Sequence, residues 1–147
     1  SAYDKYPNEK EAERLQVKLC SLEEIWENSE VISIHVPALP DTYHILGKDA
    51  LARCRDGVYI VNTSRGTTAD EKAVCEGLES GKIAGYGSAV FEFEPVTEDY
   101  PLFRFENYVC TPHTAAESYE NYRNTGMMTA QALLDVLEGR EPKNRLV

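Results

Sequence analysis

Residues 56–90 read DGVYIVNTSRGTTADEKAVCEGLESGKIAGYGSAV, and this stretch decides the fold. Its first part, VYIVNTS (58–64), is a β-branched apolar run of the kind that forms a buried strand. DEKAVCEGLESG (70–81) places apolar side chains on one helical face and ends on glycine, a normal C-terminal signal of a helix. IAGYGSAV (83–90) indicates a second strand, whose glycines imply close approach by another backbone. A strand, a helix and a strand in this order predict two parallel strands joined by a crossover helix.

The same alternation extends to both sides of this stretch. A capping box, Ser21 followed by Glu24, opens a short helix, and the β-branched run VISIHVP ends at Pro37. Because strands alternate with helices, the sequence predicts an α/β fold with a doubly wound parallel sheet that helices cover on both faces. The further expected elements are the last residues of a strand at 2–4, helices at 21–29 and 48–55, strands at 31–37 and 107–111, and one long helix at 115–139.

The long helix carries apolar side chains at helical spacing, which predicts a face that packs into a core. After it, the chain is expected to leave as an irregular tail. The apolar stripe comprises Met127, Ala130, Leu133, Leu134 and Leu137.

Composition argues against several classes of function. The formal net charge of −10 disfavours nucleic acid, whose binding depends on neutralising phosphates, and it disfavours an anionic membrane surface. No run of about 18 or more apolar residues could span a membrane, and the N-terminal SAYDKYPNEK lacks the apolar core of a signal peptide. The four cysteines form no CxxC pair, so we expect neither a zinc site nor disulfides, and a reducing cytoplasm fits best.

Ligands bind at the carboxyl ends of the strands in such sheets, and each candidate functional residue follows a strand. Asp4 closes the first strand fragment. There, an acidic residue of a dinucleotide-binding fold accepts hydrogen bonds from the adenosine ribose and favours NAD over NADP. The alternative is that Asp4 is a turn or cap residue.

Arg65 follows the second complete strand, beside Gly66, which lets a ligand approach closely. Its guanidinium can grip a carboxylate and polarise a carbonyl, or it can be a surface group that pairs with Asp70 or Glu71.

Two more polar residues follow the next two strands. In FEFEP (91–95) either glutamate could be a solvated loop charge, but Glu94, pinned by Pro95, is the better candidate for an oriented side chain. His113 could cap the long helix or pack beneath it, yet histidine titrates near neutral pH and is a natural proton donor and acceptor. Together, His113 would exchange a proton, Glu94 would orient the imidazole and favour its cationic form, and Arg65 would hold the substrate.

Four segments carry a family resemblance. In order and spacing they resemble the D-isomer-specific 2-hydroxyacid dehydrogenases, which include D-lactate, phosphoglycerate, glycerate and hydroxypyruvate-type enzymes. The resemblance covers nearly the whole chain. It implies an incomplete Rossmann-like fold, with a partial dinucleotide-binding domain at 1–139, starting at the end of its second strand, and a tail at 140–147 that returns toward a substrate domain. The segments are HVPALPDTYHILGKDAL (35–51), VNTSRG (61–66), FEFEP (91–95) and TPHTAAES (111–118).

The resemblance implies an NAD-dependent oxidoreductase that reversibly reduces a 2-oxo acid to a D-2-hydroxy acid. Hydride moves from the nicotinamide to the carbonyl carbon, while protonated His113 supplies the proton and Arg65 stabilises the developing charge. Arg65 is then substrate-binding and catalytic, Glu94 is the partner of the histidine, and His113 is the acid/base. No metal is implied, and the implied NAD contacts are Asp4, His35, Val36, Pro37, Thr63, Ser64, Arg65, Ala89, His113 and Ala116.

The sequence departs from the family pattern in three respects. Ala89 stands where the family usually has an Asp that contacts the nicotinamide carboxamide, which should weaken or mis-orient the ring. The 147 residues include neither the glycine-rich loop that would bind the pyrophosphate nor the N-terminal part of a substrate domain. We therefore expect this chain by itself to have little or no turnover.

Two other functions remain open at this stage. A non-catalytic NAD sensor or corepressor-like relative is supported by Ala89, whereas Arg65, Glu94 and His113 argue against it. The other is an inactive structural fragment. Uncovered sheet edges and apolar helix faces would favour self-association, and the resemblance suggests a homodimer for the whole enzyme. The expected partners are a small 2-oxo or 2-hydroxy acid and a second copy of the chain, with no nucleic acid and no membrane.

Overall fold

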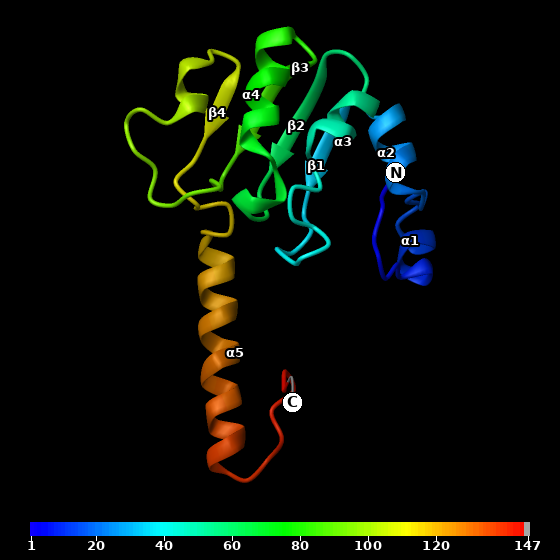
Figure 1. Ribbon diagram of the computed structural model, residues 1–147. Helices are drawn as coiled ribbons and strands as arrows, with labels where there is room; N and C mark the ends of the chain where they lie inside the picture. Colours follow the sequence, from blue (N-terminus) through cyan, green and yellow to red (C-terminus); the bar gives the residue numbers. More distant parts are fainter. Residues whose placement is uncertain (146–147) are drawn as a thin grey trace. The chain divides into compact units, whose positions relative to one another are not determined.

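The computed structural model describes residues 1–145 and contains a four-stranded parallel sheet (Figure 1). The strands pair in the order β1-β2-β3-β4, with Ile32 opposite Ile60 and Ile60 opposite Tyr86. All three pairings are parallel, so all four carboxyl ends lie at one edge of the sheet. This confirms the predicted α/β fold. The strands are β1 (Val31–Ile34), β2 (Val58–Asn62), β3 (Ile83–Ser88) and β4 (Tyr108–Cys110).

The helices between the strands begin and end where local sequence signals predict. α2 (Leu22–Asn28) begins with the capping box, in which Ser21 and Glu24 satisfy each other's backbone N–H groups. α4 (Glu71–Ser80) is capped by the Asp70 side chain and ends at Gly81, whose φ of 76° is left-handed. The third predicted helix is α3 (Lys48–Arg53).

Three short helices were not predicted. α1 (Glu9–Arg14) is capped by the Asn8 side chain, and η1 (Gly66–Thr68) and η2 (Pro101–Arg104) are single 3-10 turns. The predicted strand end at 2–4 is reduced to one parallel bridge between Ala2 and Leu19. Residues near Leu19 therefore contribute an extended segment for which no strand was expected.

The two faces of the sheet have different environments. Ile32, Ile60 and Tyr86 face a core that α2, α3, α4 and η2 help to close. On the opposite face Val31, Tyr59 and Val109 are 55–69% exposed, so helices do not cover both faces within the described residues. Tyr59 also accounts for one of the glycines of β3, because a Cβ on Gly85 would come within 3.0 Å of its ring. A neighbouring side chain, rather than a backbone, makes this close approach.

The chain divides into two compact units, Ser1–His113 and Thr114–Val147. The second contains α5 (Tyr119–Leu137), which begins four residues later than predicted because Ser118 supplies its N-cap. The predicted domain boundary after residue 139 stays a prediction, and the last two residues of the predicted tail lie outside the described part of the chain.

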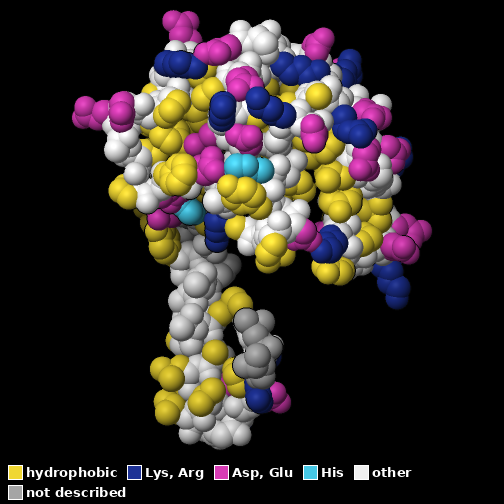
Figure 2. All heavy atoms as spheres, in the orientation of Figure 1, with side chains coloured by type: hydrophobic (Ala, Val, Ile, Leu, Met, Phe, Trp, Pro, Cys, Tyr) yellow, Lys and Arg dark blue, Asp and Glu magenta, His cyan; other side chains and the backbone are white. Residues whose placement is uncertain are grey.

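The apolar stripe of α5 is exposed, and the prediction that it packs into a core is wrong for the described residues. Leu133 and Leu137 are 60% and 73% exposed, and Figure 2 shows hydrophobic side chains on the surface of this helix. Only Asp135 of this helix is buried, and it binds Gln131 and Arg140. Within residues 114–145 no other element has an apolar face to cover the stripe. None of the described helices is both long and apolar enough to cross a membrane.

Candidate active site

A cleft of about 520 Å³ lies at the carboxyl ends of β1 and β2. Residues 35–38, which follow β1, form one wall, and Thr63, Ser64 and Arg65, which follow β2, form the other. This is the edge at which parallel sheets of this kind bind ligands. Six of the residues for which a role is predicted or implied therefore line one cleft in the surface.

The loop after β2 is fixed by Asn62, which is fully buried. Its amide nitrogen donates to the Arg65 carbonyl and to Thr68 Oγ1, each at 3.1 Å. Its amide oxygen accepts from the backbone N–H and the hydroxyl of Ser64, at 3.1 and 2.9 Å. The side chain thus satisfies its hydrogen-bonding capacity within one turn and holds the backbone from which Arg65 projects.

The Arg65 side chain is exposed, and one of its terminal nitrogens donates to the Ser64 carbonyl at 2.6 Å. The alternative interpretation, a surface pair with Asp70 or Glu71, is not what the structure shows. The Asp70 carboxylate caps α4, and the Glu71 carboxylate accepts the backbone N–H of Glu92 at 2.9 Å. The remaining guanidinium N–H groups of Arg65 can therefore face a ligand.

Gly66 has a different role from the one predicted. A Cβ at this position would lie 1.9 Å from the carbonyl carbon of Phe91 and 2.3 Å from the backbone nitrogen of Glu92. The glycine therefore admits the backbone after β3, not a ligand. This packing brings the Arg65 loop and the Glu94 loop against each other.

Glu94 and His113 are in direct contact. Glu94 Oε2 lies 3.0 Å from His113 Nδ1, and Glu94 Oε1 accepts the backbone N–H of Phe91 at 3.1 Å. The hydrogen bond with His113 holds the pKa of the Glu94 carboxyl below its ordinary value of 4.5, and the charge of Arg65 acts in the same direction. Glu94 is therefore ionised at neutral pH.

His113 is held in an uncommon backbone conformation. Its φ is 57°, and its N–H donates to the Thr111 carbonyl at 2.8 Å. Because Glu94 occupies Nδ1, the second ring nitrogen, Nε2, is the one from which a proton can pass to a ligand. The alternative role as a helix cap does not apply, since Ser118 caps α5.

The other residues of the predicted NAD contacts lie in several places. Asp4 accepts the Tyr6 N–H at 2.7 Å, as its turn-residue alternative expects. His35 lines the cleft, and its Nε2 lies 2.8 Å from Ser33 Oγ. Ala89 is buried directly after β3 and donates its N–H to the Asn62 carbonyl. Ala116 belongs to the second unit, and its contact with NAD stays a prediction.

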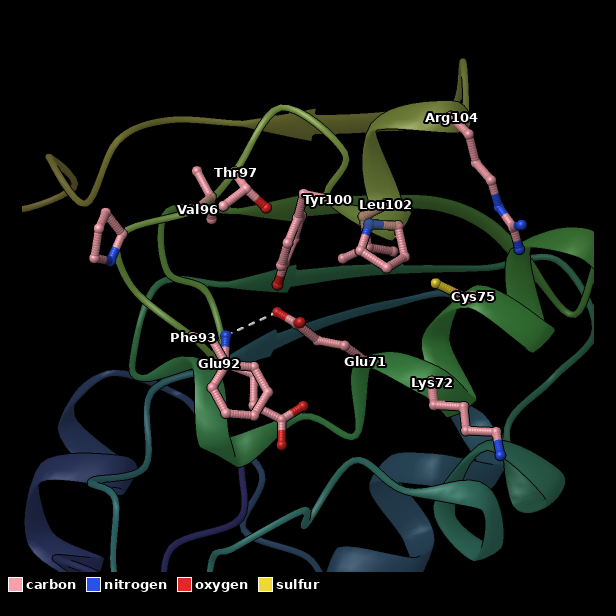
Figure 3. Close-up of a pocket in the computed structure, with 12 residues that line it drawn as sticks. Glu71, Lys72, Cys75, Glu92, Phe93, Val96, Thr97, Tyr100, Leu102 and Arg104 are labelled. Carbon is pink, nitrogen blue, oxygen red and sulfur yellow. Dashed lines mark hydrogen bonds between the residues drawn. The ribbon is translucent and has the colours of Figure 1, made fainter.

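Two residues next to the site were missed by sequence reasoning. His44 Nε2 lies 2.8 Å from Glu92 Oε1, and Glu71 accepts the Glu92 N–H beside a cavity of about 560 Å³ (Figure 3). Glu71 was considered only as a partner for Arg65. No local pattern signals these contacts, because they join residues 21 and 48 positions apart.

Within residues 1–145 no cluster of three His, Cys, Asp or Glu side chains is arranged to hold a metal ion. The four cysteines are free thiols, and burial raises the pKa of Cys54 and of Cys75.

Residues 1–115 match the family model described as D-isomer specific 2-hydroxyacid dehydrogenase, NAD binding domain. The chain is 39% identical over 142 residues to a glyoxylate reductase of Korarchaeum cryptofilum, covering 97% of the chain and 43% of the relative. It is 36% identical over 143 residues to a D-3-phosphoglycerate dehydrogenase of Archaeoglobus fulgidus, covering 97% of the chain and 27% of the relative.

A solved structure of a similar protein has the same fold as this chain. The apo-structure of D-lactate dehydrogenase from Escherichia coli superposes with a TM-score of 0.83 and 34% identity, over 99% of this chain and 45% of that chain. The chain thus spans less than half the length of each of these three relatives.

Proposed function

Because the chain belongs to the D-isomer specific 2-hydroxyacid dehydrogenase family, whose NAD binding domain it matches, we propose that it serves the reversible, NAD-dependent reduction of a 2-oxo acid to a D-2-hydroxy acid. The observation that carries this proposal is the contact between the Glu94 carboxylate and His113 Nδ1. A carboxylate that orients an imidazole is the arrangement expected for acid–base work on a carbonyl.

His113 gives the proton to the substrate oxygen in reduction and takes it back in oxidation. The negative charge of Glu94 stabilises the protonated imidazole and fixes the ring so that Nε2 faces the substrate. Two neighbours hold this carboxylate in its ionised form, since the His113 contact and the Arg65 charge both lower its pKa.

Arg65 binds the substrate carboxylate. Guanidinium groups pair with carboxylates through two parallel N–H···O hydrogen bonds. The Arg65 side chain is exposed and lines the cleft, so a substrate carboxylate can reach it. The same group stabilises negative charge that develops on the carbonyl oxygen.

The cleft at the ends of β1 and β2 fits part of a dinucleotide in size and position. NAD, when bound, supplies or accepts the hydride. We assign its contacts to His35, Val36 and Pro37 on one wall and to Thr63, Ser64 and Arg65 on the other. Asp4, Ala89, His113 and Ala116 complete the proposed set.

A non-catalytic NAD sensor is the second candidate function, and one observation favours it. Ala89 is buried after β3, at the position where the family pattern usually has an Asp that contacts the nicotinamide carboxamide. Such a protein would bind NADH without reducing any 2-oxo acid. The Glu94–His113 contact favours the enzyme.

The partners that we propose are a small 2-oxo or 2-hydroxy acid and a second copy of the chain. Glyoxylate, hydroxypyruvate and pyruvate are the first substrates to test, because relatives are named as reductases or dehydrogenases of this class. We place the protein in the reducing cytoplasm, which four free cysteines support.

The proposal is tested with the protein expressed in its full coding context, by following NADH oxidation with each of the three 2-oxo acids. We expect turnover to the D-hydroxy acid and a loss of kcat of about 10²- to 10⁴-fold in His113→Asn, which removes the acid/base. Binding of NADH without turnover on any substrate would favour the sensor. An L-hydroxy acid product, or full activity of His113→Asn, would overturn the proposed chemistry.

A further inference from the structure

The turn that carries Glu94 also contacts residues that do not line the cleft. Figure 3 shows the Glu71 side chain rising from the first turn of α4 toward this turn, and the dashed line marks its hydrogen bond with the backbone nitrogen of Glu92. The distance from the Glu92 nitrogen to Glu71 Oε1 is 2.9 Å. Glu71 thus binds the turn two residues before Glu94.

Glu71 is poorly solvated for a carboxylate. It lies half-buried beside a cavity whose lining includes Val96 and Leu102, and burial raises its pKa above the ordinary value of 4.5. A surface glutamate would avoid this environment, because removing a carboxylate from water is unfavourable unless hydrogen bonds compensate. The Glu92 N–H is such a compensating donor.

The side chain of Glu92 is held as well. Its Oε1 lies 2.8 Å from His44 Nε2, with 15% of the Glu92 side chain exposed, and the His44 ring stacks on Tyr43 at 3.9 Å. Gly66 also packs directly on the backbone of residues 91 and 92. Residues 91 and 92, immediately before Glu94 in the turn, are therefore in contact with Glu71, His44 and Gly66.

We propose that Glu71 is a positioning residue, which fixes the turn at residues 91–94 by binding the Glu92 N–H and thereby presents the Glu94 carboxylate to His113. The catalytic consequence of this contact rests on the proposed function, whereas the positioning itself does not. Within the turn, the Phe91 N–H binds Glu94 Oε1 at 3.1 Å, so displacement of this backbone moves the carboxylate with it.

Three substitutions test the contact. Glu71→Ala removes the acceptor and leaves a half-buried N–H without a partner. Glu71→Gln keeps an oxygen that can accept the same N–H but removes the charge. Glu76→Ala is the matched control, because Glu76 lies on the same helix and pairs only with Lys48 among the contacts described for residues 1–145.

The first readout is the titration of the Glu94 carboxyl, followed by ¹³C NMR in the 147-residue chain. The groups that act on this carboxyl are His113, Phe91 N–H and Arg65, and together they lower its pKa. We expect Glu71→Ala to raise the Glu94 pKa back toward 4.5, because the contact with His113 is weakened. Loss of the Glu71 charge alone would lower it, so the sign separates positioning from electrostatics.

The second readout is kinetic, in the full coding context. We expect Glu71→Ala to lower kcat about tenfold or more with a smaller change in KM, Glu71→Gln to recover most of kcat, and Glu76→Ala to match the unsubstituted protein. Equal losses in Glu71→Ala and Glu71→Gln, or an unchanged or lowered Glu94 pKa in Glu71→Ala, would overturn the proposal. If no variant oxidises NADH, the proposed function fails, and the Glu94 titration still decides the role of Glu71.

Discussion

At the scale of single residues, the candidate site depends on contacts that hold the backbone of the loops from which its charged side chains project. Asn62 holds the loop of Arg65, and Glu71 holds the turn of Glu94. Each is buried or half-buried and has its hydrogen-bond partners within the protein. Preorganisation of this kind keeps charged groups in place without reorganisation during the reaction.

Gly66 links these two loops, and its substitution is a direct test of their packing. We expect Gly66→Ala to destabilise the protein by about 1–3 kcal/mol or more, because the new methyl group overlaps backbone atoms of residues 91 and 92 that cannot rotate away. Urea unfolding checks this. Gly126→Ala is the control, since a Cβ at Gly126 in α5 meets nothing within 4 Å. Equal stability of the two variants would show that the loops are not in contact.

Sequence alone predicted the candidate reactive residues but not the residues that contact their loops. Arg65, Glu94 and His113 each follow a strand, and parallel strands bring such residues to one edge. The contacts of Glu71 and His44 with Glu92 join distant positions and involve a backbone N–H, so no residue pattern marks them. Gly66 was misread for the same reason: a glycine shows that something approaches, but not what.

At the scale of elements, the starts and ends of helices were predictable wherever the signal is local. The Ser21–Glu24 capping box and the Asp70 and Gly81 ends of α4 involve neighbouring residues only, and all lie where expected. The start of α5 was missed because Ser118, four residues into the expected helix, is its cap. Apolar periodicity indicates which face of a helix is apolar, but not what covers it, and the stripe of α5 is exposed.

At the scale of the whole molecule, exposed apolar surface lies on one face of the sheet and along α5. The exposed side chains on the sheet face are those of Val31, Tyr59 and Val109, and those on the helix include Leu133 and Leu137. Exposed apolar surface on either unit favours association. We expect the 147-residue chain to self-associate, and light scattering should give a mass above that of one chain. Replacing Val109 and Leu137 by Ser should shift the mass toward the monomer, whereas a monomer at millimolar concentration would contradict this expectation.

We propose that Glu94 and His113 act as one unit in the reduction of a 2-oxo acid. The most direct measurement compares kcat for NADH-dependent reduction in Glu94→Gln and Glu98→Gln, which change one glutamate each in the same exposed loop. We expect Glu94→Gln to lose about 10²-fold or more in kcat, because the imidazole loses the charge that orients it and stabilises its protonated form, while Glu98→Gln keeps full activity. Equal kcat values for the two variants would contradict it.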